Sequence, residues 1–307
     1  MNTLVSIIIP PHNRAPLLSR AIRSVLAQTY RSFECFIVDD TPEVIRQLKD
    51  SRLIYLRHVV NRGASATRNT GIARAAGQLI AFLDDDDEWL PAKLEKQVAL
   101  MEASPEQVGV VCCTHYASNP GCNRRAEVTK AATFIGNLYP KLLLGSCPSM
   151  MSSALVKREV FSTCGLLDET LRSYTDYDLW LRVSQKYLFA CVAEPLTVVY
   201  QHHGTRLSQD VAPRKAALEQ VLLKWGAEVR KHYGERGYHQ LERRLLTHIY
   251  VNATLQSAQA GELRTATRRL LEVIRLRPTR PRLYGWLMFR LLRAIWARVK
   301  SPRVTDT

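Results

Sequence analysis

The sequence lacks the features that mark several large classes of protein. It has no G-x-G-x-x-G after its first apolar run and no G-K-[S/T] triplet, so the two commonest phosphate-binding loops are missing. No apolar segment approaches the length of a membrane span. The seven cysteines form no C-x-x-C pair and no spacing typical of secreted disulfide scaffolds. We therefore expect reduced thiols and a cytoplasmic protein.

Acidic residues are scarce near the C-terminus, where basic residues accumulate. The chain has 307 residues and a net charge of +15. Between Arg264 and Arg303 there are twelve arginines and lysines against one acid, Glu272, so this segment carries eleven of the fifteen net charges. The basic character is therefore a property of the C-terminal segment and not of the whole fold.

Five consecutive acids, residues 84–88, follow the apolar run Leu79–Leu83. The run fits a strand buried on both faces, as in a parallel sheet. Folding alone does not require so many like charges at a strand end, and a divalent cation would relieve their repulsion. Oxygen ligands favour Mg²⁺ or Mn²⁺ over zinc. In an extended chain Asp84 and Asp86 point the same way, which predicts an Asp-x-Asp metal site.

Other interpretations of the acids follow from the residues behind them. Pro91 is expected to open a helix, and negative charge stabilises a helix start, so some of the acids are compatible with that role alone. An EF-hand loop is excluded because Trp89 occupies the position that needs glycine.

Apolar runs alternate with helical patterns over the first two-thirds of the chain. The expected strands are Val5–Ile9, Phe33–Val38, Leu53–Leu56, Leu79–Leu83, Val108–Cys113, Met150–Val156 and Val198–His203. This spacing predicts an α/β fold with a doubly wound, mainly parallel sheet, which binds ligands at the carboxyl ends of its strands. Gly77 is expected to be the C-cap of the preceding helix. From about Asp210 the pattern is helical, which predicts a C-terminal helical extension.

Five ordered blocks resemble the family 2 glycosyltransferases of GT-A fold. They are V-S-I-I-I-P with Asn13-Arg14, A-I-R-S-V-L-A-Q-T-Y (21–30), residues 33–40, residues 61–77 and F-L-D-D-D-D-E-W-L-P (82–91). The resemblance implies an inverting transferase that uses a nucleoside-diphosphate sugar and a divalent cation, Mn²⁺ or Mg²⁺. The GT-A domain would comprise residues 1–208 and a basic helical region residues 209–307.

The resemblance also implies the residues of the site. The donor nucleotide would be bound by Pro10, His12, Asn13, Arg14, Asp39, Asp40, Asn61, Gly63, Arg68, Asp84 and Asp85. Asp40 would meet the base and Arg68 the diphosphate, and the metal would be held by Asp84 and Asp86. His203 is open between a further metal ligand and a solvated loop histidine. By their residue types alone, Asp39 and Asp40 equally fit a strand-end turn.

Two loops depart from the family pattern. The family has an aromatic residue where this chain has His12, preceded by Pro11, and a Gly/Asn-Ser-Thr-Asp stretch where it has Thr41-Pro42-Glu43. Both loops would line the nucleotide, so the base preference stays open, with UDP as the expectation.

The block Y-T-D-Y-D-L-W (174–180) resembles the family's E-D-x-x-L-W, with Thr175 in place of the glutamate. The resemblance makes Asp176 the catalytic base. An acceptor hydroxyl is a poor nucleophile, so a carboxylate within hydrogen-bond reach must take its proton. The alternative is that Asp176 caps a helix over Tyr177–Gln185.

The C-terminal region predicts a helical hairpin and a basic amphipathic helix. Gly261–Pro278 looks like the second helix of a tetratricopeptide unit, and one unit makes no solenoid. In Leu283–Lys300 one helical face carries the apolar residues Met288, Leu292, Ile295 and Val299. This pattern predicts a helix on an anionic membrane surface, peripheral on the inner face; the alternative is a packing helix with a solvated basic side.

These features together predict a glycosyltransferase that acts on a glycan or lipid-linked acceptor in cell-envelope polysaccharide synthesis. A sugar-nucleotide pyrophosphorylase is one alternative, but it requires a glycine-rich loop where this chain has Pro10-Pro11-His12-Asn13. A basic nucleic-acid-binding protein is another, but it leaves the acids without a role, and the aromatics form no stacking module. We therefore expect no nucleic-acid partner.

Overall fold

The computed structural model describes residues 3–11, 15–39, 50–118, 125–127, 134–146, 151–200, 211–278 and 283–289. The chain divides into two compact units. The first comprises Met1–Leu142, Ser146–Thr170 and Thr175–His202, and the second comprises Leu143–Gly145, Leu171–Tyr174 and His203–Thr307.

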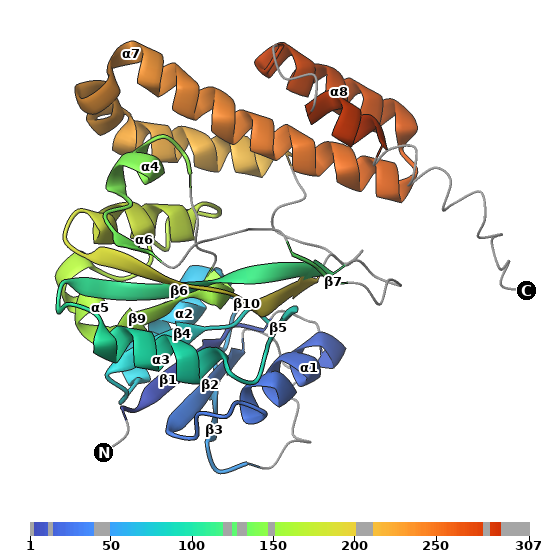
Figure 1. Ribbon diagram of the computed structural model, residues 1–307. Coiled ribbons are helices and arrows are strands. Elements are labelled where there is room, and N and C mark those ends of the chain that lie inside the picture. The colour runs from blue at the N-terminus through green and yellow to red at the C-terminus, as the bar shows by residue number, and fades with distance from the viewer. Residues whose placement is uncertain are drawn as a thin grey trace, which may run out of the picture. The chain divides into compact units, whose positions relative to one another are not determined.

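A mainly parallel sheet organises the first unit (Figure 1). One half holds β1 (Val5–Ile9), β2 (Phe33–Asp39), β3 (Leu53–Arg57) and β4 (Leu79–Phe82), all parallel, in the order β3-β2-β1-β4. Helices α1 (Ala15–Leu26) and α2 (Gly63–Arg74) lie between them in the chain. This half confirms the predicted alternation, and its strands end at a common carboxyl edge.

The other half of the sheet is mixed. It continues through β9 (Leu155–Lys157), β6 (Val108–Ser118), β10 (Leu188–Tyr200) and β5 (Asp87–Trp89). β10 runs parallel to β6, whereas β9 and β5 are antiparallel to their neighbours. The short strands β7 (Arg125–Glu127) and β8 (Phe134–Gly136) pair with β6 and β10. The remaining elements are α3 (Lys93–Ala103), α4 (Tyr139–Leu143), the 3₁₀ turn η1 (Met151–Ser153), α5 (Arg158–Cys164) and α6 (Thr175–Ser184).

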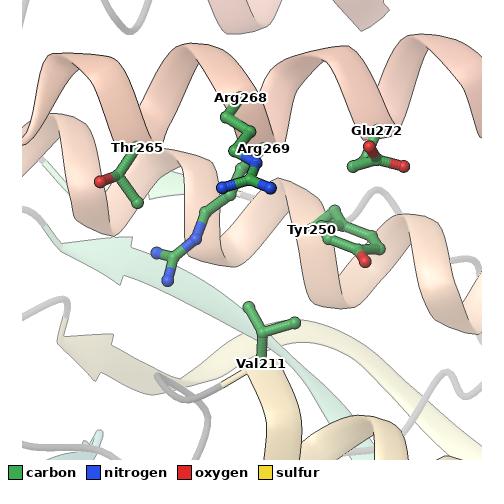
Figure 2. A pocket seen from close by; sticks show the side chains of 6 residues that line it. All are labelled: Val211, Tyr250, Thr265, Arg268, Arg269 and Glu272. Carbon is green, nitrogen blue, oxygen red and sulfur yellow. The ribbon is translucent and has the colours of Figure 1, made fainter.

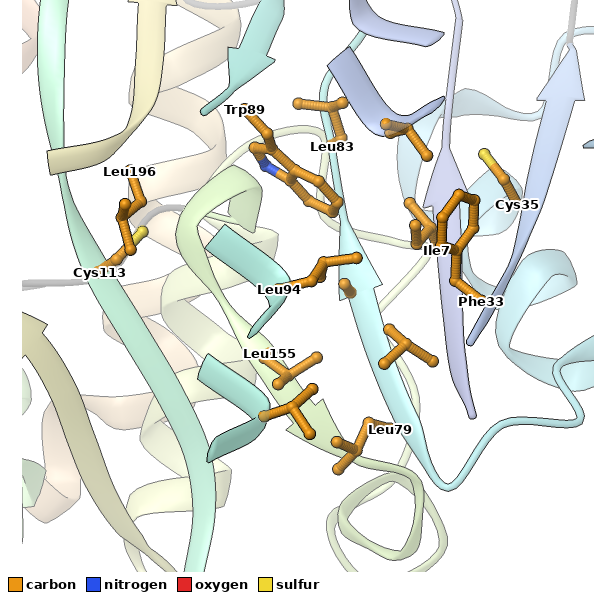
Figure 3. Close-up of a cluster of buried hydrophobic side chains, with 14 of the residues drawn as sticks. Ile7, Phe33, Cys35, Leu79, Leu83, Trp89, Leu94, Cys113, Leu155 and Leu196 are labelled. Carbon is orange, nitrogen blue, oxygen red and sulfur yellow. The ribbon is translucent and has the colours of Figure 1, made fainter. Parts of the chain in front are cut away.

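The core lies where alternate strand residues meet the apolar faces of α1 and α3 (Figure 3). Ile7 and Ile9 of β1 point into this cluster together with Leu94 of α3. Ile8 points to the other face, where it packs against Gly71 of α2: a Cβ on Gly71 would lie 2.6 Å from an Ile8 methyl group. Burial on both faces explains why four of the five residues of β1 are apolar.

Four local predictions were wrong. β10 begins ten residues before the expected Val198 and lies inside the sheet, because its apolar first half also pairs with β6. The run expected over Met150–Val156 is split between η1 and β9. Helix α3 begins at Lys93, after a turn in which the carbonyl of Pro91 accepts the N–H of Thr29 at 2.9 Å. Gly77 is no C-cap, because α2 ends at Arg74.

The second unit is helical. α7 (Val211–Ala260) is bent at Gly234, whose φ of 63° is non-helical, and the chain doubles back there into two arms (Figure 1). α8 (Leu263–Leu276) follows a turn at Gly261, with φ 79°. Ala266, Leu270 and Val273, spaced by one helical turn, form its buried face, as an amphipathic helix requires. None of the helices in the described ranges combines the length and the apolar character needed to cross a bilayer.

Candidate active site

The acids after β4 form a tight turn. The N–H of Asp87 donates to the carbonyl of Asp84 at 3.0 Å, and the chain then enters β5. Carboxylate oxygens of Asp84, Asp86 and Asp87 lie within 4.8 Å of one another. In an extended chain Asp87 would point away from Asp84. The turn instead brings the Asp87 carboxylate to the same side as that of Asp84, so the prediction of an extended chain is wrong here. Three converging carboxylates, two of them half-buried, fit a divalent cation with oxygen ligands.

Arg68 of α2 reaches this turn. Its side chain is 9% exposed, and its Nη2 donates to Oδ1 of Asp84 at 2.5 Å. Helix α2 is positioned at its start by Gly63, whose N–H donates to the Asn61 side chain at 2.9 Å and whose φ of 82° favours glycine. Asn61 and Gly63 thus form the turn that leads into α2, and Arg68 of that helix contacts Asp84.

Asp176 stands in the first turn of α6, where its Oδ1 accepts the N–H of Tyr177 at 2.8 Å. Desolvation raises the pKa of the Asp176 carboxyl, Arg68 lowers it, and the charge on Asp84 raises it further. Asp176 is therefore within electrostatic reach of Arg68 and Asp84, which are about a hundred residues away in sequence. A carboxylate with a raised pKa, next to a cation and an acidic turn, has the properties of a general base.

Two residues close to Asp176 in sequence, Asp178 and Tyr174, also have distinctive local structure. Asp178 is completely buried, and its Oδ2 accepts a hydrogen bond from Nε of Arg182 at 3.0 Å, so it has a structural role within α6. Tyr174, just before α6, has a φ of 63°, a strained value for a residue other than glycine.

Arg20, a residue that the sequence analysis missed, braces the acidic turn. Its Nη2 donates to the carbonyl of Asp86 at 2.7 Å, and its guanidinium lies 3.6 Å from the ring centre of Tyr200. The Tyr200 hydroxyl in turn donates to Glu88 at 2.5 Å.

Ser152 of η1, also missed, meets the same turn from β9's side of the sheet. Its Oγ accepts the N–H of Asp84 at 3.1 Å, and its carbonyl accepts the indole N–H of Trp89 at 2.7 Å. Neither Ser152 nor Arg20 has a signal in the sequence, because both contacts are between residues more than sixty positions apart.

Three of the other residues predicted to bind the donor lie within the described ranges. Pro10 is buried directly after β1, Asp85 is 1% exposed, and Asp39 ends β2 opposite Arg57, so their backbones lie at the carboxyl ends of β1, β4 and β2. The remaining candidates lie outside the described residues: His12, Asn13, Arg14, Asp40 and His203. Their roles stay predictions.

A pocket of about 360 Å³ lies within the second unit (Figure 2). Val211, Tyr250, Thr265, Arg268, Arg269 and Glu272 line it. Two of its side chains are already engaged: Arg269 donates to the Ala253 carbonyl at 3.0 Å and Glu272 accepts from Arg275 at 2.7 Å. None of the predicted site residues belongs to this pocket.

Comparison with known proteins agrees with this geometry. The family model "Glycosyl transferase family 2" matches residues 6–165. The Escherichia coli glucosyltransferase WfaP is 39% identical over 216 residues, which cover 67% of this chain and 80% of that protein. The putative colanic acid biosynthesis glycosyl transferase WcaA of E. coli K12 is 32% identical, covering 66% and 74%. An uncharacterized glycosyltransferase of Rickettsia felis is 34% identical over 68% of this chain, which spans only 35% of the length of that relative.

Solved structures show the same fold at low identity. S. aureus TarS 1–349 in complex with UDP-GlcNAc superposes with a TM-score of 0.61 at 15% identity, covering 95% of this chain and 88% of that fragment. Mannosyltransferase PcManGT from Pyrobaculum calidifontis, in complex with GDP-Man and Mn²⁺, gives 0.54 at 19% identity, covering 97% and 88%. The predicted fold and the predicted family are thus confirmed: the chain belongs to glycosyl transferase family 2 and has a GT-A fold.

Proposed function

We propose that the protein is an inverting glycosyltransferase that moves a sugar from a nucleoside-diphosphate donor, with UDP as the expected nucleotide, to a lipid-linked acceptor in cell-envelope glycan synthesis. The observation that carries the proposal is the ion pair between Arg68 and Asp84, where Asp84 belongs to a group of three converging carboxylates and both residues are electrostatically coupled to Asp176. WfaP and WfgD of E. coli, the latter 42% identical over 103 residues, are both named UDP-Glc:alpha-D-GlcNAc-diphosphoundecaprenol beta-1,3-glucosyltransferases, which supports the donor and the acceptor class.

Asp176 acts as the base in this mechanism. The acceptor hydroxyl attacks the anomeric carbon, the bond from that carbon to the diphosphate oxygen breaks, and Asp176 takes the hydroxyl proton. One base suffices because attack and departure occur on opposite faces of the sugar, which inverts its configuration. The raised pKa of Asp176 makes it a stronger proton acceptor than an ordinary aspartate.

Arg68 and the acidic turn would meet the negative charge of the departing nucleoside diphosphate. Arg68 stabilises it as a cation that is already oriented by Asp84. Asp84, Asp86 and Asp87 are the residues that would hold Mn²⁺ or Mg²⁺, which neutralises diphosphate charge when bound.

Melting temperature with a panel of nucleoside diphosphates, each with Mn²⁺, Mg²⁺ or chelator, tests the donor site. A ligand at a hundred times its dissociation constant adds about 2.7 kcal/mol to the free energy of unfolding. We expect one nucleotide to raise the melting temperature with Mn²⁺ and the rise to disappear in Asp86→Ala. A flat response to every nucleotide would contradict the proposal.

We also propose that the second unit binds an anionic membrane surface. The exposed side of α8 carries Arg264, Arg268, Leu271 and Arg275 in one row, opposite its buried face. Leu271 is 50% exposed within this row. Cations around an exposed apolar side chain suit the headgroup region of an anionic bilayer, and the recess beside Arg268 in Figure 2 offers space for a headgroup.

Exposed apolar side chains of the segment Leu283–Phe289 also support membrane binding. Its buried residue is Leu287, whereas Trp286 is 46% and Phe289 62% exposed. Met288, expected on the apolar face, is 46% exposed. The other members of that face lie outside the described residues.

A further inference from the structure

Lys93, the first residue of α3, is a completely buried cation. Its Nζ donates to Oε1 of Gln97 at 2.6 Å and lies 3.9 Å from the ring centre of Trp89. Within the described part of the chain no carboxylate forms an ion pair with it. A buried ammonium that is met only by an amide and an aromatic ring is costly to the folded state.

Gln97 is fixed so that its oxygen faces this ammonium. Its amide N–H groups donate to the carbonyls of Val111 at 3.0 Å and Ser153 at 2.8 Å. With both donors engaged, the amide cannot turn away from Lys93 without breaking bonds to β6 and η1.

Trp89 connects Lys93 to the acidic turn. Its backbone N–H donates to Oγ of Ser24 at 3.1 Å, and its indole N–H donates to the carbonyl of Ser152. The hydroxyl of the same Ser152 accepts the N–H of Asp84. A series of contacts therefore runs from the Lys93 ammonium through the Trp89 side chain and Ser152 to the backbone N–H of Asp84, the first residue of the acidic turn.

We propose that Lys93 is a positioning residue for the acidic turn: its ammonium holds the Trp89 ring, and through Ser152 it sets the orientation in which Asp84 meets a divalent cation. This inference rests on the proposed function, because it assigns Lys93 to the metal and donor site described above. The positive charge is the active element, since a methionine of similar length would fill the same space without the cost of burying an ion.

Titration separates this role from a purely structural one. Burial lowers the pKa of Lys93 to about 8, against the opposing effect of Cys113 and Cys112 on β6. The other groups that contact the ammonium, the Gln97 amide on α3 and the Trp89 ring on β5, are not titratable in this range. Deprotonation removes the attraction to the Trp89 ring, so cation affinity at the acidic turn should fall above pH 8.

The stability contribution of Lys93 has the opposite sign. Its pKa in the folded state lies below the unfolded value, so between about pH 8 and the ordinary lysine pKa of 10.5 the unfolded chain binds more protons. Over this interval its contribution to stability rises with pH while its contribution to cation binding falls. For a residue that only supported the fold, cation binding would not fall over the pH range in which the stability contribution rises.

The experiment uses the full chain and Mn²⁺ as the probe. Mn²⁺ affinity, measured by calorimetry from pH 6.5 to 9.5, is compared in wild type, Lys93→Met and Lys93→Arg, with Lys96→Met as the control on the exposed side of α3. We expect Lys93→Met to bind Mn²⁺ about tenfold more weakly, the lower end of the effect seen for residues that orient metal ligands. Lys93→Arg should restore affinity and remove the loss above pH 8.

Two outcomes would overturn the inference. One is equal Mn²⁺ affinity in Lys93→Met and Lys96→Met, and the other is a wild-type affinity that does not fall above pH 8. The second needs no variant, so it applies even if Lys93→Met does not fold. Neither outcome affects the proposed function, which fails instead if Asp86→Ala retains the nucleotide response.

Discussion

Asp176 is held in a setting that favours its protonated form. Desolvation and the Asp84 charge both raise its pKa, against the opposing effect of Arg68. A carboxyl whose folded-state pKa lies above its unfolded value destabilises the fold as pH rises through that range. The site thus sacrifices some stability for a better proton acceptor.

Replacing Asp176 with asparagine should separate catalysis from folding. We expect kcat to fall by roughly a hundredfold to ten-thousandfold, the usual contribution of a general base, because asparagine cannot accept the proton of the acceptor hydroxyl. Melting temperature at pH 7 should stay equal or rise, since the charge that opposes folding is removed. Asp178→Asn is the control, because it should lower stability by breaking the pair with Arg182.

The pH dependence gives a second check on the same residue. Wild-type kcat/KM should rise with pH through the raised pKa of Asp176, above the ordinary value of 3.8. Unchanged turnover in Asp176→Asn, at any pH, would contradict the role of base.

Glycine at position 77 decides how the chain enters β4. A Cβ there would lie 2.6 Å from the Leu4 carbonyl oxygen and 2.7 Å from the Ser6 backbone nitrogen. The Gly77 N–H also donates to Oγ of Ser6 at 2.8 Å. The residue is therefore glycine because β1 passes closely, and its neighbours are backbone atoms that cannot move aside.

Gly77→Ala should therefore destabilise the protein by about 1–3 kcal/mol, the usual cost of forcing an atom into a packed site. Chemical denaturation measures the change. Gly136→Ala on β8 is the matched control, because a Cβ there meets nothing within 4 Å. Equal stability of the two variants would show that β1 shifts freely.

The elements could be predicted to different degrees from the sequence. β1 and β4 are apolar on both faces, so their runs in the sequence identify them directly. The turn that begins at Asp84 cannot be predicted from the alternation of residues along a strand, because that alternation is a local pattern. The geometry of the turn depends on hydrogen bonds to Ser152 of η1 and Arg20 of α1.

The site follows the same distinction. Arg68 and Asp176 were identified by resemblance to a family, whereas Asp84 was also indicated by the run of acids after an apolar strand. The electrostatic coupling of the three could not be predicted from their spacing, because it depends on how β4, α2 and α6 are placed in the fold. Lys93 had no signal, since a lysine near a helix start is ordinarily exposed.

At the scale of the molecule, the basic charge is concentrated on a helix face in the second unit. Replacing Arg264, Arg268 and Arg275 with glutamate should abolish sedimentation with phosphatidylglycerol vesicles at low salt. Each basic residue near an anionic surface contributes about 1 kcal/mol. Binding to phosphatidylcholine vesicles should be weak in every variant.

The control changes the same charge elsewhere in this unit. Lys215, Arg236 and Arg243 are exposed on α7, and their replacement with glutamate should leave binding largely intact. Equal loss in both triple variants would mean that net charge alone, and not the α8 row, attracts the vesicle.

The bend in α7 depends on the backbone torsion angles of one residue, Gly234, with φ 63° and ψ −172°. A straight helix of fifty residues would extend about 75 Å, far beyond the length of a small domain. Because the chain doubles back at Gly234, Tyr238 on one arm meets Arg230 on the other at 3.6 Å and blocks any Cβ at Gly226. If the bend opened, the two arms would lose these contacts with each other, and the matching arm of a second copy of the chain could replace them. The torsion angles of Gly234 therefore also favour the closed monomer over an exchange of helices between two copies.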